Sequence, residues 1–343
     1  MTVHPSKLNF VATPFRPHPL MTNPHIQTLA GEFFRKTKRQ PPFRRVRLDT
    51  PDDDFVDVDF VEIEGQIWSQ LGDDAPILYL LHGLEGDARR GYAIDLYQSA
   101  VQAGYRCVGI NYRSCSGEMN RQPFFYHMGA TGDVGLVLDY LLETYPDAPI
   151  FMVGVSLGGN ILLKFLGEQS ESLSERVAGG AAISPVFIAT GKQKISDDPI
   201  GRLYGNNLLS RLKKKVRLKA HDLMDTPADP YRALTAKTIR EFDDAITAPL
   251  HGFTDSEDYY ARSNSVNFLD GIRRPTLLLR AYDDPFFNRD IPLDVIERNQ
   301  WLVSLFPENG GHVGFVEGIS PLSYTNWAQT QTIRFFDNIR ELL

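Results

Sequence analysis

Short apolar runs alternate with longer amphipathic stretches along most of the chain. The run "PILYLLH" is continuously apolar, which is typical of a strand buried on both faces of a sheet. Six such runs predict strands, at residues 76–82, 106–112, 149–156, 178–184, 275–282 and 301–306. Four stretches between or after them predict helices, at residues 92–104, 131–145, 158–170 and 324–342. This alternation predicts the α/β class, with a mostly parallel central sheet and helices on both faces.

Two further segments precede this series. Residues 44–49 ("RRVRLD") and 54–62 ("DFVDVDFVE") alternate apolar and polar positions, which predicts an opening antiparallel pair of strands. The first 42 residues are rich in proline and basic residues. We therefore expect residues 1–42 to form an irregular N-terminal arm packed on the domain.

The strand–helix rhythm is interrupted between two of the predicted strands. Residues 185–270 contain helical stretches such as 207–224 and 236–253 instead of strands. An insertion here would sit over the carboxyl ends of the strands, where open α/β sheets bind ligands. We therefore predict a core formed by residues 43–184 and 271–343, with 185–270 as a helical cap.

The composition and net charge of the chain limit the classes of molecule that we expect it to bind. The chain has 343 residues, 42% of them hydrophobic and 23% charged, and its net charge is −7. A net negative charge argues against nucleic acid as a partner. We find no secretory signal and no apolar run of the roughly 20 residues that span a bilayer. The expected protein is cytoplasmic, and the basic stretch 211–219 leaves loose membrane contact open.

Candidate chemistry begins at the sequence "GVSLG", centred on Ser156. It matches G-x-S-x-G between a predicted strand and a predicted helix, the context in which this motif presents a nucleophilic serine on a sharp turn. The alternative is a tight turn whose serine only caps the helix. A serine nucleophile needs a neighbouring base. A suitably placed base elsewhere in the chain would therefore favour the nucleophile over the capping serine.

The base and its acid partner follow in the expected order. His312 lies in the loop "ENGGHVGF" after the last predicted strand, and Asp284 follows the strand before it, with Asp283 as the close competitor. The order serine, acid, histidine at successive strand ends is that of a Ser–His–Asp triad. We therefore predict Ser156, Asp284 and His312 as catalytic residues.

An oxyanion formed during attack needs hydrogen-bond donors. One donor should be the backbone N–H of Leu157, directly after the serine, and the other that of Leu84 in the loop "LLHGLEG". We interpret His82 in this loop as a structural histidine, not as the base.

Three phenylalanines near the predicted site loops, Phe124, Phe253 and Phe286, are candidates for an apolar acyl pocket, although such residues are more often core. The pair Asp243 and Asp244 is expected to form an ion pair with Arg240 that fixes the cap. The two cysteines and the histidines show no metal-ligand spacing, and we expect neither a metal nor a cofactor.

Several segments make the chain resemble the α/β-hydrolase superfamily. They are "NPHIQT", "HGLEG", "NYRSCSGEMNR", "GVSLGGN", "IREFDDAIT", "AYDDPF" and "GGHVGF". Within the superfamily, the chain resembles bacterial carboxylesterases related to eukaryotic medium-chain phospholipases and ethanol acyltransferases. The resemblance implies the same triad. One departure is Ser114, where this branch usually has glycine.

These observations predict a serine esterase that acts on a small-molecule or lipid ester, with medium-chain acyl esters plausible. One rival is an acyltransferase that passes the acyl group to an alcohol. A second rival is a non-catalytic binding protein on the same scaffold. The acyl chain length, the alcohol or headgroup and the oligomeric state stay open.

Overall fold

The central sheet has eight strands. The computed structural model describes residues 3–33, 40–62, 71–190, 199–320 and 323–343, and its sheet order is β1-β2-β4-β3-β5-β6-β7-β8. The strands are β1 Phe43–Asp49, β2 Phe55–Val61, β3 Ile77–Leu81, β4 Arg106–Asn111, β5 Ile150–Val155, β6 Val177–Ile183, β7 Thr276–Leu279 and β8 Leu302–Leu305. Strands β3 to β8 run parallel, and β2 is antiparallel to both β1 and β4. The predicted mostly parallel sheet and its opening antiparallel pair are confirmed.

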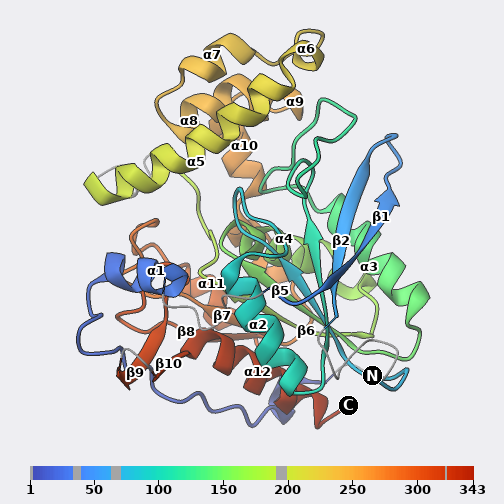
Figure 1. Cartoon of the computed structure of the whole chain (residues 1–343). Helices are drawn as coiled ribbons and strands as arrows, with labels where there is room; N and C mark the ends of the chain where they lie inside the picture. Colours follow the sequence, from blue (N-terminus) through green and yellow to red (C-terminus); the bar gives the residue numbers. More distant parts are fainter. Residues whose placement is uncertain (1–2, 34–39, 63–70, 191–198, 321–322) are drawn as a thin grey trace.

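Helices cover both faces of this sheet (Figure 1). One face carries α2 (Gly91–Gln102) and α12 (Trp327–Arg340), and the other carries α3 (Gly132–Thr144) and α4 (Leu157–Gln169). Within β3, Tyr79 belongs to the core under α3 and α4, whereas its neighbours Leu78 and Leu80 belong to the core under α2 and α12. Burial on both faces therefore explains why the strand sequences are continuously apolar.

Another set of helices connects β6 to β7 and lies over one end of the sheet (Figure 1). They are α5 Pro199–Leu218, α6 Ala220–Leu223, α7 Pro230–Thr235, α8 Ile239–Phe242, the π-helical turn η5 Asp243–Thr247, α9 Ala248–Leu250, α10 Ser256–Ser263 and the 3₁₀ segment η6 Ser265–Gly271. Several of them share a small core of their own, which includes Leu209, Val216 and Phe242. The last segment, η6, instead packs against α4. The division into core and cap stays a prediction.

The N-terminal segment is less irregular than expected. Helix α1 (Pro24–Phe33) forms within it because Asn23 accepts hydrogen bonds from the backbone N–H groups of His25 and Ile26, and Pro24 fits the first helical position. The buried Gln27 then ties this helix to the hairpin of β9 (Val316–Ser320) and β10 (Ser323–Asn326). Among the helices of the described residues, none has the length and apolar character of a bilayer span.

Candidate active site

Ser156 stands on the turn between β5 and α4. Its backbone has φ 56° and ψ −118°, a conformation that costs strain in a residue with a side chain. The flanking glycines allow neighbouring backbone segments to approach the turn closely. A Cβ on Gly154 would overlap the carbonyl oxygen of Gly158, and a Cβ on Gly158 would overlap the carbonyl oxygen of Leu81. The glycine-ringed serine of the sequence is therefore a strained strand-to-helix turn that leaves the hydroxyl accessible.

The structure brings the three predicted catalytic side chains together. The Ser156 hydroxyl lies 2.9 Å from Nε2 of His312, and Nδ1 of His312 lies 2.8 Å from Oδ2 of Asp284. Asp284 is almost fully buried, whereas Ser156 lines a cavity. A ring that donates from Nδ1 to the carboxylate has a free Nε2 lone pair to accept the serine proton.

The two neighbouring aspartates after β7 have different partners. Asp284 binds His312 through one oxygen and accepts the backbone N–H of Phe286 with the other. Asp283 instead accepts the backbone N–H of Gly311, at 2.9 Å. Asp284 thus contacts the imidazole, and Asp283 contacts the backbone of the loop that carries it.

Further residues hold the His312 loop, and the sequence analysis did not assign them. Thr28, on α1, accepts the backbone N–H of His312 at 3.0 Å. Ser184, at the end of β6, accepts the N–H of Val313 at 3.0 Å. The segment "NPHIQT", which was noted only as part of the resemblance, supplies Thr28 as well as the buried Gln27.

The loop after β3 packs directly beside the serine. A Cβ on Gly83 would lie 3.2 Å from Cβ of Ser156. Gly86 donates its N–H to the carbonyl of Gly83, and Glu85 donates its N–H to the Tyr126 hydroxyl. Within the described part of the chain, the N–H groups of Leu84 and Leu157 have no hydrogen-bond partner. Two unsatisfied donors beside the serine are what an oxyanion site requires.

His82 is buried, and its contacts do not fit the role of a base. Its Nε2 accepts the backbone N–H of Tyr112, so Nδ1 carries the proton and donates to the carbonyl of Gly83. Burial lowers the pKa of His82 to about 3, which keeps the ring neutral. The residue therefore holds the loop after β3 in place.

The cap contacts the same loop through α5. Lys215 forms an ion pair with Glu85 at 2.7 Å, and Arg211 donates to the Glu85 carbonyl. The Lys215 ammonium also lies 3.1 Å from the thiol of Cys115, whose pKa burial raises to about 11. A cap helix is thus bonded to the residue that follows Leu84.

A cavity of about 570 Å³ opens onto Ser156 and His312. This volume lies in the range of about 300–1,000 Å³ that is typical of small-molecule sites. Most of its lining is apolar, with Leu157, Val186 and Leu208 among the side chains.

Of the three predicted pocket phenylalanines, only Phe286 lines this cavity, and its ring stacks on His312 at 4.2 Å. The structure places Phe124 and Phe253 elsewhere. Phe124 packs with the cap core, and Phe253 packs against His127 and Tyr259. Both rings pack into apolar clusters next to the cavity, and neither lines it.

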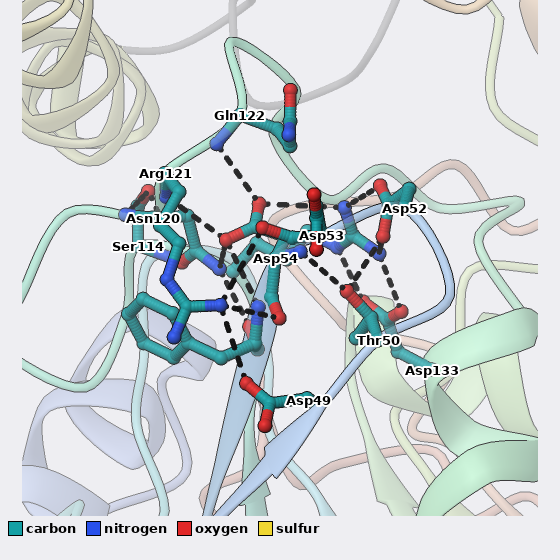
Figure 2. A network of polar contacts seen from close by, with 12 residues as sticks. Asp49, Thr50, Asp52, Asp53, Asp54, Ser114, Asn120, Arg121, Gln122 and Asp133 are labelled. Atoms are coloured by element: carbon teal, nitrogen blue, oxygen red, sulfur yellow. Dashed lines mark hydrogen bonds and ion pairs between the residues drawn. The ribbon is translucent and has the colours of Figure 1, made fainter.

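Ser114 lies in a polar network that also includes Asp54 and Asn120 (Figure 2). Its φ is 62°, the left-handed region that favours glycine, which explains why glycine suits this position. The backbone N–H of Ser114 donates to Asn120, and Asn120 donates to the fully buried Asp54. Asp54 also accepts the backbone N–H groups of Arg121 and Gln122. The departure at Ser114 therefore lies in a well-bonded loop.

The expected ion pair between Arg240 and the neighbouring aspartates is absent from the described residues. Arg240 pairs with Glu257 instead, at 2.5 Å. Asp244 accepts the backbone N–H of Ser256 at the start of α10. Asp243 is buried, lines the cavity, and accepts the hydroxyl of Tyr260. The two carboxylates separate because successive helical residues point in different directions.

Asp243 should lower the stability of the protein as pH rises above about 4. Burial, with repulsion from Asp244, raises its pKa from 3.8 to about 6. The folded state then binds the proton more tightly than the unfolded chain, so the unfolding free energy falls as pH rises from about 4 to 6, by on the order of 3 kcal/mol at most. We expect Asp243→Asn to raise Tm at pH 8 relative to the wild type, and this difference to shrink toward pH 4. A difference in Tm that does not vary with pH would contradict the assignment.

No three His, Cys, Asp or Glu side chains of the described residues form a cluster able to hold a metal ion. The expectation of no metal and no cofactor stays a prediction.

Comparison with known proteins agrees with the fold. Residues 76–319 match the family described as alpha/beta hydrolase fold. The chain is 34% identical over 301 residues to "Putative esterase YheT" of Escherichia coli (strain K12), covering 87% of this chain and 85% of that protein. It is 31% identical to a monoacylglycerol lipase of Saccharomyces cerevisiae over 71% of this chain and 56% of that protein.

A third relative is medium-chain fatty acid ethyl ester synthase/esterase 2 of Saccharomyces cerevisiae, 27% identical over 79% of this chain and 64% of that protein. These matches agree with the branch named from the sequence motifs. Together with the strand order, the family match shows that the chain belongs to the α/β-hydrolase family.

Proposed function

We propose that this chain is a serine hydrolase that cleaves carboxylic esters through an acyl-enzyme on Ser156. The observation that carries the proposal is the hydrogen-bonded series Ser156–His312–Asp284, in which Ser156 and His312 line the apolar cavity. Relatives named as esterase and lipase support the coarse activity, ester hydrolysis.

In the proposed reaction, His312 Nε2 takes the hydroxyl proton as Ser156 Oγ attacks the ester carbonyl. The N–H groups of Leu84 and Leu157 then bind the oxyanion, and Asp284 stabilises the charged imidazole. Collapse of the tetrahedral intermediate releases the alcohol, which takes the proton from His312. Water, activated by the same histidine, attacks the acyl-enzyme and releases the acid.

The acyl group belongs in the apolar part of the cavity. Phe286 stacks on His312, and the cap helix α5 contributes Tyr204, which stacks on Phe286 at 5.3 Å. Burial of each methylene of an acyl chain on such a surface contributes about 0.8 kcal/mol. We therefore propose esters with medium-length acyl chains as substrates, consistent with a cavity of about 570 Å³.

A second candidate activity is acyl transfer to an alcohol. It would use the same acyl-enzyme, with an alcohol in place of water. The relative named as an ethyl ester synthase and esterase favours keeping this candidate. A non-catalytic role is disfavoured, because the strained serine and its two partners are all present.

The experiment is hydrolysis of p-nitrophenyl esters from acetate to palmitate by the purified chain. We expect turnover to peak at an intermediate chain length, because short chains bury little apolar surface and long ones exceed the cavity. Labelling by a fluorophosphonate, checked by mass spectrometry of the Ser156 peptide, provides a readout that does not depend on the ester chosen.

Product analysis with added ethanol separates the two candidates. Ethyl ester formed at the expense of free acid indicates transfer, and free acid alone indicates hydrolysis. If no ester in the series turns over and Ser156 remains unlabelled, the proposed function fails. The hypothesis of a non-catalytic binding protein is then supported.

A further inference from the structure

The active-site cavity contains a second polar group, supplied by the cap. Asp243, Thr247 and Tyr260 all line the cavity. One carboxylate oxygen of Asp243 accepts the Thr247 hydroxyl at 2.6 Å, and the other accepts the Tyr260 hydroxyl at 2.7 Å. The carboxyl group is buried, with only 8% of the residue exposed. None of these residues takes part in the triad or the oxyanion site.

An irregular turn of helix presents this carboxylate. Residues Asp243–Thr247 form a π-helical turn between α8 and α9, and the N–H of Ala248 donates back to the carbonyl of Asp243. Single π turns inside α-helical segments occur frequently at functional sites. Asp244, the next residue, does not line the cavity and binds the start of α10.

Among the described residues, no lysine or arginine forms an ion pair with Asp243. Its charged neighbour is Asp244, which is repulsive, and burial together with this repulsion raises the pKa of Asp243. A carboxylate has about four lone-pair sites, and the two hydroxyls occupy two of them. The group therefore retains the capacity to accept hydrogen bonds from a ligand in the cavity.

Because the Asp243 carboxylate accepts hydrogen bonds, it should bind the part of an ester that carries a hydrogen-bond donor. An acyl chain has no hydrogen-bond donor, and it would leave a buried carboxylate poorly solvated. A hydroxyl group of the alcohol part can donate to Asp243 and can also exchange hydrogen bonds with Tyr260. Hydrogen bonds to an ionised acceptor are about twice as strong as those between neutral groups.

We propose that Asp243, with Tyr260 and Thr247, binds free hydroxyl groups on the alcohol part of the substrate, so that the preferred substrates are partial esters of a small polyol. This inference rests on the proposed ester chemistry at Ser156. It adds a specificity site in the cap to a catalytic site in the core.

The first test compares two octanoyl esters, 1-monooctanoylglycerol and ethyl octanoate, which differ in the free hydroxyls of the alcohol part. For the wild type we expect a higher kcat/KM with the glycerol ester. In Asp243→Asn the ratio of the two values should fall about ten- to a hundredfold, as expected for loss of a hydrogen bond to a charged acceptor. Tyr260→Phe should lower it in the same direction.

Asp244→Asn is the matched control, because its amide oxygen can still accept the Ser256 N–H and the residue does not line the cavity. Its ratio should equal that of the wild type. The inference is overturned if Asp243→Asn leaves the ratio unchanged, or if Asp244→Asn lowers it equally. Should Asp243→Asn fail to fold, Tyr260→Phe decides the kinetic test.

A second test measures ligand binding at Asp243 independently of the proposed ester hydrolysis. Calorimetry with Ser156→Ala measures the Kd of 1-O-octylglycerol and of ethyl octyl ether, neither of which is an ester. We expect tighter binding of octylglycerol, and loss of this preference when Asp243→Asn is added. If neither ester turns over, the proposed function fails while the binding preference still reports on the site. Equal Kd values for the two ethers overturn the inference.

Discussion

Ser156→Ala is expected to lower the turnover of every ester substrate by about four orders of magnitude or more. The expectation follows from the position of the hydroxyl, 2.9 Å from the His312 imidazole on the turn between β5 and α4. The turn should survive the change, because alanine keeps the Cβ that already lies beside Gly83. Steady-state assay of the best p-nitrophenyl ester, with Tm measured on the same samples, tests this.

The same variant should lose fluorophosphonate labelling completely. A loss of turnover without any change in Tm assigns the effect to chemistry and not to folding. A turnover within tenfold of the wild type would contradict the mechanism, since it would require another nucleophile. Cys115 is a poor substitute, because burial raises its pKa to about 11 and it does not line the main cavity.

The second large effect is expected at Asp284, compared with its neighbour Asp283. Asp284→Asn should lower kcat about 10⁴-fold, because an amide that donates toward Nδ1 favours the wrong tautomer of His312. Asp283→Asn should have a much smaller effect, since its amide oxygen can still accept the N–H of Gly311. Measuring kcat for both variants against pH checks this prediction.

This matched pair is informative because the two residues are adjacent and carry the same charge. A change in net charge near the site affects both variants equally, whereas His312 is hydrogen-bonded to Asp284 and the backbone of Gly311 to Asp283. Equal losses in the two variants would show that either carboxylate can serve the imidazole. A larger loss in Asp283→Asn would reverse the assignment.

The sequence was sufficient to predict the fold because its central strands are buried on both faces. Such strands must be apolar throughout, and the intervening helices are amphipathic, so the alternation is visible in the residues themselves. The six expected strand segments cover β3 to β8 except for Val177, the first residue of β6, and the pair before them is antiparallel. The arm was the exception: α1 was missed because proline and basic residues obscure its short pattern.

The candidate triad could also be located from the sequence, for a related reason. Parallel strands end at the same edge of a sheet, so residues that follow successive strands meet there although they lie far apart in the chain. Ser156, Asp284 and His312 each follow such a strand. Local spacing could not separate Asp284 from Asp283, because both follow β7 by a few residues and only side-chain direction distinguishes them.

Tertiary structure alone decided the surroundings of that triad. Thr28 bonds a residue 284 positions away, and nothing in the local sequence indicates this contact. Asp243 and Asp244 are equivalent in the sequence pattern, whereas the structure gives them different partners. The sequence by itself thus determined the fold class and predicted the serine and histidine that the structure brings together, because both depend on burial patterns and strand ends. The lining of the cavity depends on how the cap helices pack, which involves contacts between segments with no periodic signature.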